Sequence, residues 1–161
     1  MAPPCEVQEL ISLLRSKSIT FSLAESCTGG LIASKVTDCP GASQVFLGSA
    51  VTYSNESKER LLGVEHQVLI DHGAVSEETA RQMAVGACRA FGSDYSAAVT
   101  GIAGPGGATD TKPVGLVFIA VSDGSRTIVS KNNFTGDRKQ IRERTAEAAL
   151  GMLDDMIRGI L

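Results

Sequence analysis

Ser26 is the strongest candidate for chemistry in this sequence, because it stands between a β-prone run, residues 19–24, and a helix-prone run that begins after Gly29-Gly30. Open α/β sheets bind their ligands at the carboxyl ends of strands. A serine there can present its hydroxyl, and neighbouring glycines let backbone N–H groups approach an anion or a developing oxyanion. The segment therefore predicts a nucleophilic serine. The simpler alternative is that Ser26 or Thr28 only caps the helix.

A serine nucleophile needs a base, and the residue types favour lysine over histidine. The only histidines, His66 and His72, lie in a polar stretch that we expect to be a loop, without a partner for a Ser-His-Asp triad. Tyr53 ends a second apolar run, and Lys58 falls on the helix expected to follow it. A partly buried lysine with a lowered pKa can replace histidine. Taken alone, Tyr53 is equally an ordinary strand aromatic and Lys58 a surface lysine.

Cys27 is the rival nucleophile, because the pKa of a thiol at a helix N-terminus is lowered. No histidine stands near it in the sequence, and small buried cysteines are common, so residue types alone leave both nucleophiles open. The four cysteines (Cys5, Cys27, Cys39 and Cys88) form no C-x-x-C pair. We therefore expect no structural zinc site, and reduced thiols of the kind found in cytoplasmic proteins.

A glycine-rich segment at residues 100–107 follows a later apolar run and is the second candidate for ligand binding. Its N–H groups need not face side chains, so they can hold a phosphate or a carboxylate. The segment is neither a Walker motif nor a G-x-G-x-x-G fingerprint. Arg138 and Arg142 lie four residues apart and share a helix face, where they could clamp a phosphate. A surface turn and a solvated salt-bridge face are the structural alternatives.

Helical and β-prone segments alternate along the chain and close in a hairpin. Helices are expected over residues 5–17, 31–36, 58–62, 76–91 and 138–160, and strands over 19–24, 44–53, 95–100, 114–122 and 127–134. Ser54, Ser76 and Asp137 are suitable N-caps, and Gly63 is a suitable C-cap. This order predicts an α/β fold, a three-layer α/β/α sandwich with a mixed β-sheet, in one domain over residues 1–161.

Composition argues against several functional classes. The 161 residues are 43% hydrophobic and carry a net charge of −3, without a basic cluster of the kind that binds nucleic acid. No apolar run approaches the roughly 18 residues that span a membrane, and the N-terminus does not read as a secretory signal. We expect a cytoplasmic protein with a small-molecule substrate and neither nucleic-acid nor membrane partners. Apolar helices and small size favour a homo-oligomer.

Several motifs in one order resemble the CinA C-terminal domain family, the PncC-type nicotinamide-mononucleotide deamidases. The resemblance covers about residues 5–160. It rests on AESCTGG at 24–30, GSAVTYSNESK at 48–58, HGAVS at 72–76, TGIAGPGG at 100–107, PVGLV at 113–117 and GDR at 136–138. Many members carry this domain behind a molybdopterin-binding-like domain, so the chain resembles the stand-alone form.

The resemblance implies hydrolysis of the carboxamide of nicotinamide mononucleotide to nicotinate mononucleotide and ammonia, in pyridine nucleotide recycling, without a metal or other cofactor. Ser26 would be the nucleophile, and Lys58 with Tyr53 would handle its proton. Arg142, and less surely Arg138, would meet the ligand. The substrate-binding residues implied are Cys27, Thr28, Gly29, Gly30, Thr100, Gly101, Ala103, Gly104, Arg138 and Arg142. The alternative is an inactive nucleotide-binding or partner module of the same fold.

Overall fold

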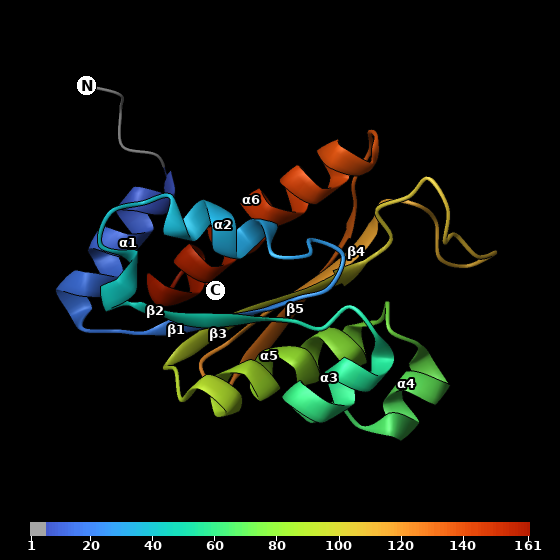
Figure 1. Ribbon diagram of the computed structural model, residues 1–161, viewed down its shortest axis with the longest axis horizontal. Coiled ribbons are helices and arrows are strands. Elements are labelled where there is room, and N and C mark those ends of the chain that lie inside the picture. The colour runs from blue at the N-terminus through green and yellow to red at the C-terminus, as the bar shows by residue number, and fades with distance from the viewer. Residues whose placement is uncertain (1–5) are drawn as a thin grey trace.

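A computed structural model describes residues 6–161 and shows a mixed five-stranded sheet between two layers of helices (Figure 1). The strands are β1 (Phe21–Glu25), β2 (Phe46–Val51), β3 (Tyr95–Gly101), β4 (Leu116–Ser122) and β5 (Thr127–Asn133). Their order in the sheet is β2-β1-β3-β4-β5, with β1 parallel to both neighbours and the last two pairings antiparallel. The α/β class and the mixed sheet predicted from the sequence are confirmed.

Helices cover both faces of the sheet (Figure 1). One layer contains α1 (Glu6–Lys17), α2 (Leu31–Thr37) and α6 (Arg138–Ile157), and the other contains α3 (Asn55–Leu62), α4 (His66–His72) and α5 (Glu77–Phe91). A short 3₁₀ turn, Ala42–Gln44, precedes β2. Cys5, the first residue of the helix expected over 5–17, lies outside the described residues. Within residues 6–161 no helix combines the length and the apolar character that crossing a membrane requires.

The sheet divides the apolar interior into two cores. Successive residues of a strand point to opposite faces, so Leu23 packs with α1, α2 and α6 while its neighbour Ala24 packs with α3, α4 and α5. All five residues of β1 are buried, as expected for a parallel strand covered on both faces. Because β1 is an interior strand, with β2 and β3 on either side, the residues that follow it, Ser26 onwards, begin between the two helical layers.

Most capping signals are confirmed. The side chains of Ser54, Ser76 and Asp137 accept hydrogen bonds from backbone N–H groups in the first turns of α3, α5 and α6. Gly63 ends α3 in the left-handed region, with φ of 68°.

The loop expected around the two histidines is wrong, because they begin and end α4. This helix has only seven residues and buries only Leu69. It therefore carries no apolar periodicity that would have revealed it in the sequence.

Candidate active site

The loops after β1 and β3 begin at the same edge of the sheet, because these strands are parallel and adjacent, with Glu25 paired to Val99. Together with the segment after β2, they enclose a pocket of about 250 Å³. Its lining residues are Ser26, Cys27, Tyr53, Lys58, Ala74, Val75, Thr100, Gly101, Ile102, Ala103, Gly104, Gly106, Gly107 and Arg138. The pocket thus lies where open α/β sheets bind ligands.

Ser26 and Lys58 meet in this pocket. The Nζ atom of Lys58 donates to the Oγ atom of Ser26 at 3.0 Å and to the carbonyl of Thr52 at 2.7 Å. Lys58 is only 1% exposed, although lysine is among the residues least often fully buried. Burial lowers the pKa of Lys58 from 10.5 to about 8. The pair therefore has the contact and the basicity that proton transfer from a serine requires.

The start of α3 explains why Lys58 points inward. Ser54 caps the helix, and the polar residues Asn55, Glu56 and Ser57 that follow are partly or fully exposed. Lys58 and Leu62 lie four residues apart, on the same face of the helix, and are the two buried residues of α3. The lysine therefore occupies a core-facing helix position, and its stem is buried along with its amine.

Glu25 organises the loop that carries Ser26, and sequence reasoning missed it. Its carboxylate is fully buried at the end of β1. The donors to its two oxygens are the hydroxyls of Thr28 and Ser49 and the backbone N–H groups of Ile32 and Ala33. The first turn of α2 is thus satisfied by Glu25, while its N-cap, Gly30, makes no side-chain bond. The expectation that Ser26 or Thr28 caps α2 is wrong.

Cys27 lines the pocket but is poorly suited to act as a nucleophile. The thiol is buried, and burial raises its pKa from 9.0 to about 11 despite the nearby cations. The expectation that a helix N-terminus lowers this pKa is therefore wrong, because α2 begins only at Leu31 and desolvation dominates. A thiol that stays protonated near neutral pH is a weak nucleophile, so the geometry favours Ser26.

Tyr53 and Arg138 form the rim of the pocket. Arg138 donates from Nη2 to the hydroxyl oxygen of Tyr53 at 3.2 Å and from Nη1 to the carbonyl of Gly104 at 2.7 Å. Tyr53 itself is 64% exposed. Arg138 therefore joins the end of β2 to the glycine-rich segment through two neutral partners, and no carboxylate within residues 6–161 forms an ion pair with it.

Arg142 lies outside the pocket lining. Its Nε donates to the carbonyl of Cys27 at 3.2 Å and its Nη2 to the carbonyl of Thr28 at 2.7 Å. Thr28, Gly29 and Gly30 are likewise absent from the lining. Of the predicted substrate-binding residues, the structure therefore brings Cys27, Thr100, Gly101, Ala103, Gly104 and Arg138 to the pocket and leaves the other four outside its lining.

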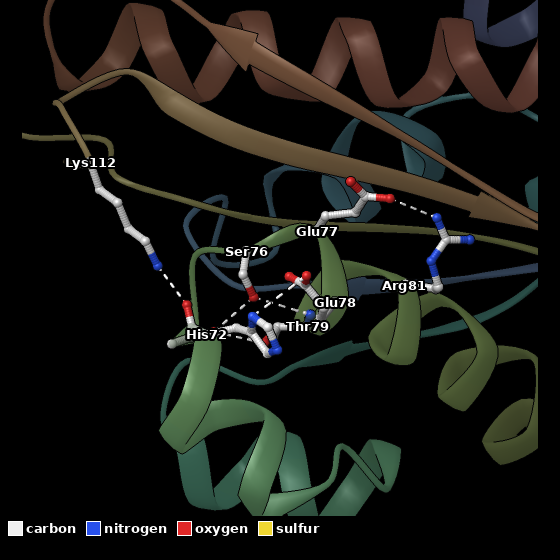
Figure 2. A network of polar contacts seen from close by, with 8 residues as sticks. His72, Ser76, Glu77, Glu78, Thr79, Arg81 and Lys112 are labelled. Carbon is white, nitrogen blue, oxygen red and sulfur yellow. Dashed lines mark hydrogen bonds and ion pairs between the residues drawn. The ribbon is translucent and has the colours of Figure 1, made fainter.

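The turn between α4 and α5, residues 73–76, also contributes to the pocket lining. Sequence reasoning did not assign this turn to the binding site. Thr100 donates to the carbonyl of Ala74 at 2.7 Å, and Ser76 and Thr79 both donate to the carbonyl of Gly73. Lys112 donates to the carbonyl of His72 at 2.6 Å, as Figure 2 shows. These bonds hold Ala74 and Val75 against the pocket.

The pocket has one sign of charge. Among the described residues that line it, the charged side chains are those of Lys58 and Arg138, whereas the whole chain carries a net charge of −3. The backbone N–H groups of Ala103, Gly104, Gly106 and Gly107 donate to no oxygen in residues 6–161. Cations and free N–H groups favour an anionic ligand. Across the same residues, no three His, Cys, Asp or Glu side chains gather as a metal site would require.

A model of the CinA C-terminal domain family matches residues 6–157. The chain belongs to this family. Among relatives, a CinA-like protein of Endomicrobium trichonymphae is 54% identical over 141 residues, which cover 88% of this chain and 33% of the relative. A CinA-like protein of Geobacter sulfurreducens is 52% identical over 141 residues, covering 88% and 34%. The chain thus spans about a third of the length of the curated relatives it matches.

Solved structures of the CinA superfamily have the same fold. The competence/damage inducible protein CihA of Agrobacterium tumefaciens is 41% identical, with a TM-score of 0.89 over 95% of this chain and 97% of that one. A CinA superfamily protein of Klebsiella pneumoniae is 28% identical, with a TM-score of 0.90 over 96% and 99%. Both solved chains are covered almost completely.

Proposed function

We propose that this CinA-family protein is an amidohydrolase that converts nicotinamide mononucleotide to nicotinate mononucleotide and ammonia, in pyridine nucleotide recycling. The observation that carries the proposal is the 3.0 Å hydrogen bond from the buried Nζ of Lys58 to the Oγ of Ser26. The choice of substrate is supported by the family resemblance of the motifs and by the cationic, N–H-rich lining of the pocket.

The first half of the reaction forms an acyl-enzyme. Neutral Lys58 takes the proton of the Ser26 hydroxyl while Oγ attacks the carboxamide carbon, which gives a tetrahedral oxyanion. Lys58, now an ammonium, returns the proton to the amide nitrogen, and the carbon–nitrogen bond breaks to release ammonia. Tyr53 at the rim is the second group that could supply this proton. A covalent intermediate divides the hydrolysis of a poor electrophile into two easier steps.

The second half hydrolyses the acyl-enzyme. A water molecule gives a proton to Lys58 and attacks the ester carbon, and the ester bond to Oγ then breaks as Oγ recovers a proton. The product is a carboxylic acid, which loses its proton to solvent and becomes a carboxylate, and Ser26 and Lys58 return to their starting states. The same lysine therefore serves as base and acid in turn, which requires a pKa near the working pH. The lowered pKa of about 8 meets this requirement.

The pocket suits a small anion. Its volume of about 250 Å³ is a little below the usual range for small-molecule sites, roughly 300–1,000 Å³. Arg138 and the unpaired N–H groups of the glycine-rich segment offer partners to a phosphate. We place the reaction in a reducing, cytoplasmic setting, because Cys27 and Cys88 are buried free thiols.

Ammonia release tests the proposal directly. The wild-type protein is incubated with nicotinamide mononucleotide, and ammonia and the acid product are measured against Ser26→Ala and a control, Ser125→Ala, which removes an exposed hydroxyl from the β4–β5 turn. We expect release from wild type and the control, and loss of release from Ser26→Ala. Absence of release from wild type would reject the function, and equal release from Ser26→Ala would reject the mechanism. Nucleotide binding without turnover would instead favour an inactive binding module.

A further inference from the structure

The loop that carries the nucleophile, residues 26–30, is bonded to the buried carboxylate of Glu25. Glu25 accepts from the hydroxyl of Thr28 at 2.8 Å and from the N–H groups of Ile32 and Ala33 at 2.9 and 3.2 Å. Backbone N–H groups and the helix dipole stabilise a carboxylate at a helix N-terminus. The charge of Glu25 therefore needs no cationic partner. Glu25 therefore ties the loop to both β1 and α2.

The same loop is also bonded to Arg142 of α6. Arg142 donates to the carbonyls of Cys27 and Thr28, which are consecutive residues of the loop. A Cβ atom built on Gly29 would lie 3.7 Å from the Nη2 atom of Arg142, so the guanidinium lies close against the loop. These are charge-assisted bonds, which are stronger than bonds between neutral groups. Arg142 thus directs its Nε and Nη2 at the backbone of this loop rather than into the pocket.

These contacts determine which N–H groups remain for an oxyanion. The Ile32 and Ala33 N–H groups are used by Glu25, and the Ser26 N–H donates to the carbonyl of Val99. The Ser26 carbonyl accepts from Gly29, and C=O and N–H point in opposite directions across a trans peptide. The N–H of Cys27 is therefore turned away from the inside of the loop. Between residues 6 and 161 it donates to no carbonyl, carboxylate or hydroxyl oxygen, and its interaction is with the sulfur of its own side chain, which an oxyanion would replace.

We infer that Glu25 and Arg142 are positioning residues that lock this loop so that the Cys27 N–H receives the oxyanion formed at Ser26, and that Arg142 is not a substrate ligand. The inference rests on the proposed function, because it assumes that Ser26 attacks a carbonyl. It differs from the role implied by the family resemblance, in which Arg142 meets the ligand. It also places the oxyanion donor in the turn before α2 rather than at the helix N-terminus, whose first N–H groups Glu25 occupies.

A neutral serine-reactive reagent separates positioning from substrate binding. With diisopropyl fluorophosphate, the Ser26 Oγ–phosphorus bond forms, the phosphorus–fluorine bond breaks, and fluoride leaves while Lys58 takes the hydroxyl proton. The reagent carries no charge for an arginine to bind, but its phosphoryl oxygen gains negative charge during the reaction. Intact-protein mass spectrometry gives both the rate constant of labelling and the final labelled fraction. Loss of folded protein lowers the fraction, whereas a misplaced loop lowers the rate constant.

The variants are Arg142→Met and Glu25→Gln, with Lys139→Met as the control from an exposed position of the same helix. We expect the rate constant of labelling to fall roughly tenfold to a hundredfold in both variants, the scale of misaligned or lost oxyanion donors, with complete final labelling. For nicotinamide mononucleotide, kcat should fall by a similar factor with little change in KM. The Lys139→Met control should match wild type.

The opposite result has a distinct signature. If Arg142 binds the substrate, Arg142→Met will be labelled at the wild-type rate while KM rises, and the inference is overturned. If Glu25→Gln or Arg142→Met fails to fold, Thr28→Val removes a single bond to Glu25 and should still slow labelling; wild-type labelling of that variant would also overturn the inference. Labelling of wild type without ammonia release would reject the substrate while leaving the positioning test intact, and no labelling of wild type would reject the nucleophile itself.

Discussion

Two hollows in this molecule differ in size and in chemistry, and the smaller one holds the candidate active site. The hollow between α1 and α6 has a volume of about 770 Å³, against about 250 Å³ for the pocket at Ser26. Its charged lining is mostly acidic, namely Glu6, Glu9, Glu147, Asp154 and Asp155, with Lys35 and Arg158. The pocket at Ser26 has two cations and no carboxylate. The larger volume and the side chains suited to catalysis are therefore found in different hollows.

The two lysines show why the smaller hollow is the reactive one. Lys35 in the large hollow has a side chain 29% exposed and pairs with Glu143 at 2.7 Å, as an ordinary surface lysine does. Lys58 is buried against a hydroxyl and a carbonyl, and its pKa is lowered to about 8. Only the second arrangement prepares an amine to accept a proton near neutral pH. Local desolvation, rather than open space, distinguishes the site.

The strongest test of this comparison exchanges each lysine for methionine. Methionine keeps a long apolar stem and removes the amine, so Lys58→Met should fold and lose roughly a hundredfold to ten-thousandfold in kcat, the usual contribution of a general base. Lys35→Met loses only a partly exposed ion pair and should keep wild-type kcat. Steady-state ammonia release, with circular dichroism of both variants, makes the measurement. Equal activity of Lys58→Met and Lys35→Met would remove the distinction between the two hollows.

The pH dependence gives the next largest effect. Lys58 acts as a base only when neutral, and its pKa is lowered by burial to about 8. The value of kcat/KM should therefore fall about tenfold for each pH unit below 8 and level off above it. A lysine of ordinary pKa would place this bend near 10.5. Rates from pH 6 to 10 decide between the two, and a flat profile over this range would argue against Lys58 as the base.

The lowered pKa of Lys58 should also make the free energy of unfolding depend on pH, whether or not substrate is present. In the unfolded chain Lys58 titrates near 10.5, and in the folded protein near 8. Between these values the unfolded chain binds more protons, so the contribution of Lys58 to the free energy of unfolding rises with pH across this window. Urea denaturation of wild type and Lys58→Met at pH 7.5 and 10.5 measures the contribution as a difference, which cancels other titrating groups. The wild type should gain relative to the variant at the higher pH.

Sequence patterns predicted the layers of the fold and most of the pocket. The spacing of apolar residues and the N-cap residues predicted the strands and the longer helices, because both signals come from residues close together in the sequence. The pairing of Ser26 with Lys58 came from residue type and motif order, and the structure supplies the distance of 3.0 Å between Oγ and Nζ. Such a distance depends on the packing of α3 against the sheet, which no local pattern encodes.

Glu25 and Arg142 make contacts that sequence reasoning did not supply. Glu25 ends a strand whose five residues are all buried, and a carboxylate in such a run is interpreted by default as the start of a loop. The usable signal was the absence of a good N-cap residue before α2, where Gly30 stands. The family resemblance placed Arg142 at the ligand, and Arg138 less surely; in the structure Arg138 lines the pocket, whereas Arg142, one helical turn further on, donates to the carbonyls of Cys27 and Thr28.

Arg138→Gln tests whether the positive charge of the pocket at Ser26 contributes to substrate binding. The substitution removes one of the two cations of the pocket, and glutamine can still donate one hydrogen bond toward Gly104. If the phosphate of the substrate meets this cation, KM should rise roughly tenfold, because a charged hydrogen bond is lost, with a smaller effect on kcat. Initial rates over a range of nicotinamide mononucleotide concentrations separate the two constants. A change in kcat alone would assign Arg138 to Tyr53 and the reacting atoms instead.

Arg158→Gln is the matched substitution in the large hollow and should have the smallest effect. Arg158 stands at the opposite end of α6 from Arg138 and pairs with Asp154 at 2.8 Å, one turn away, on a partly exposed face. Exposed pairs at this spacing contribute little to stability, so the free energy of unfolding should fall only slightly. The values of kcat and KM should stay within about twofold of wild type, since the two hollows share no lining residue. A rise in KM equal to that of Arg138→Gln would mean that substrate enters the acidic hollow, and it would reverse the assignment of the two hollows.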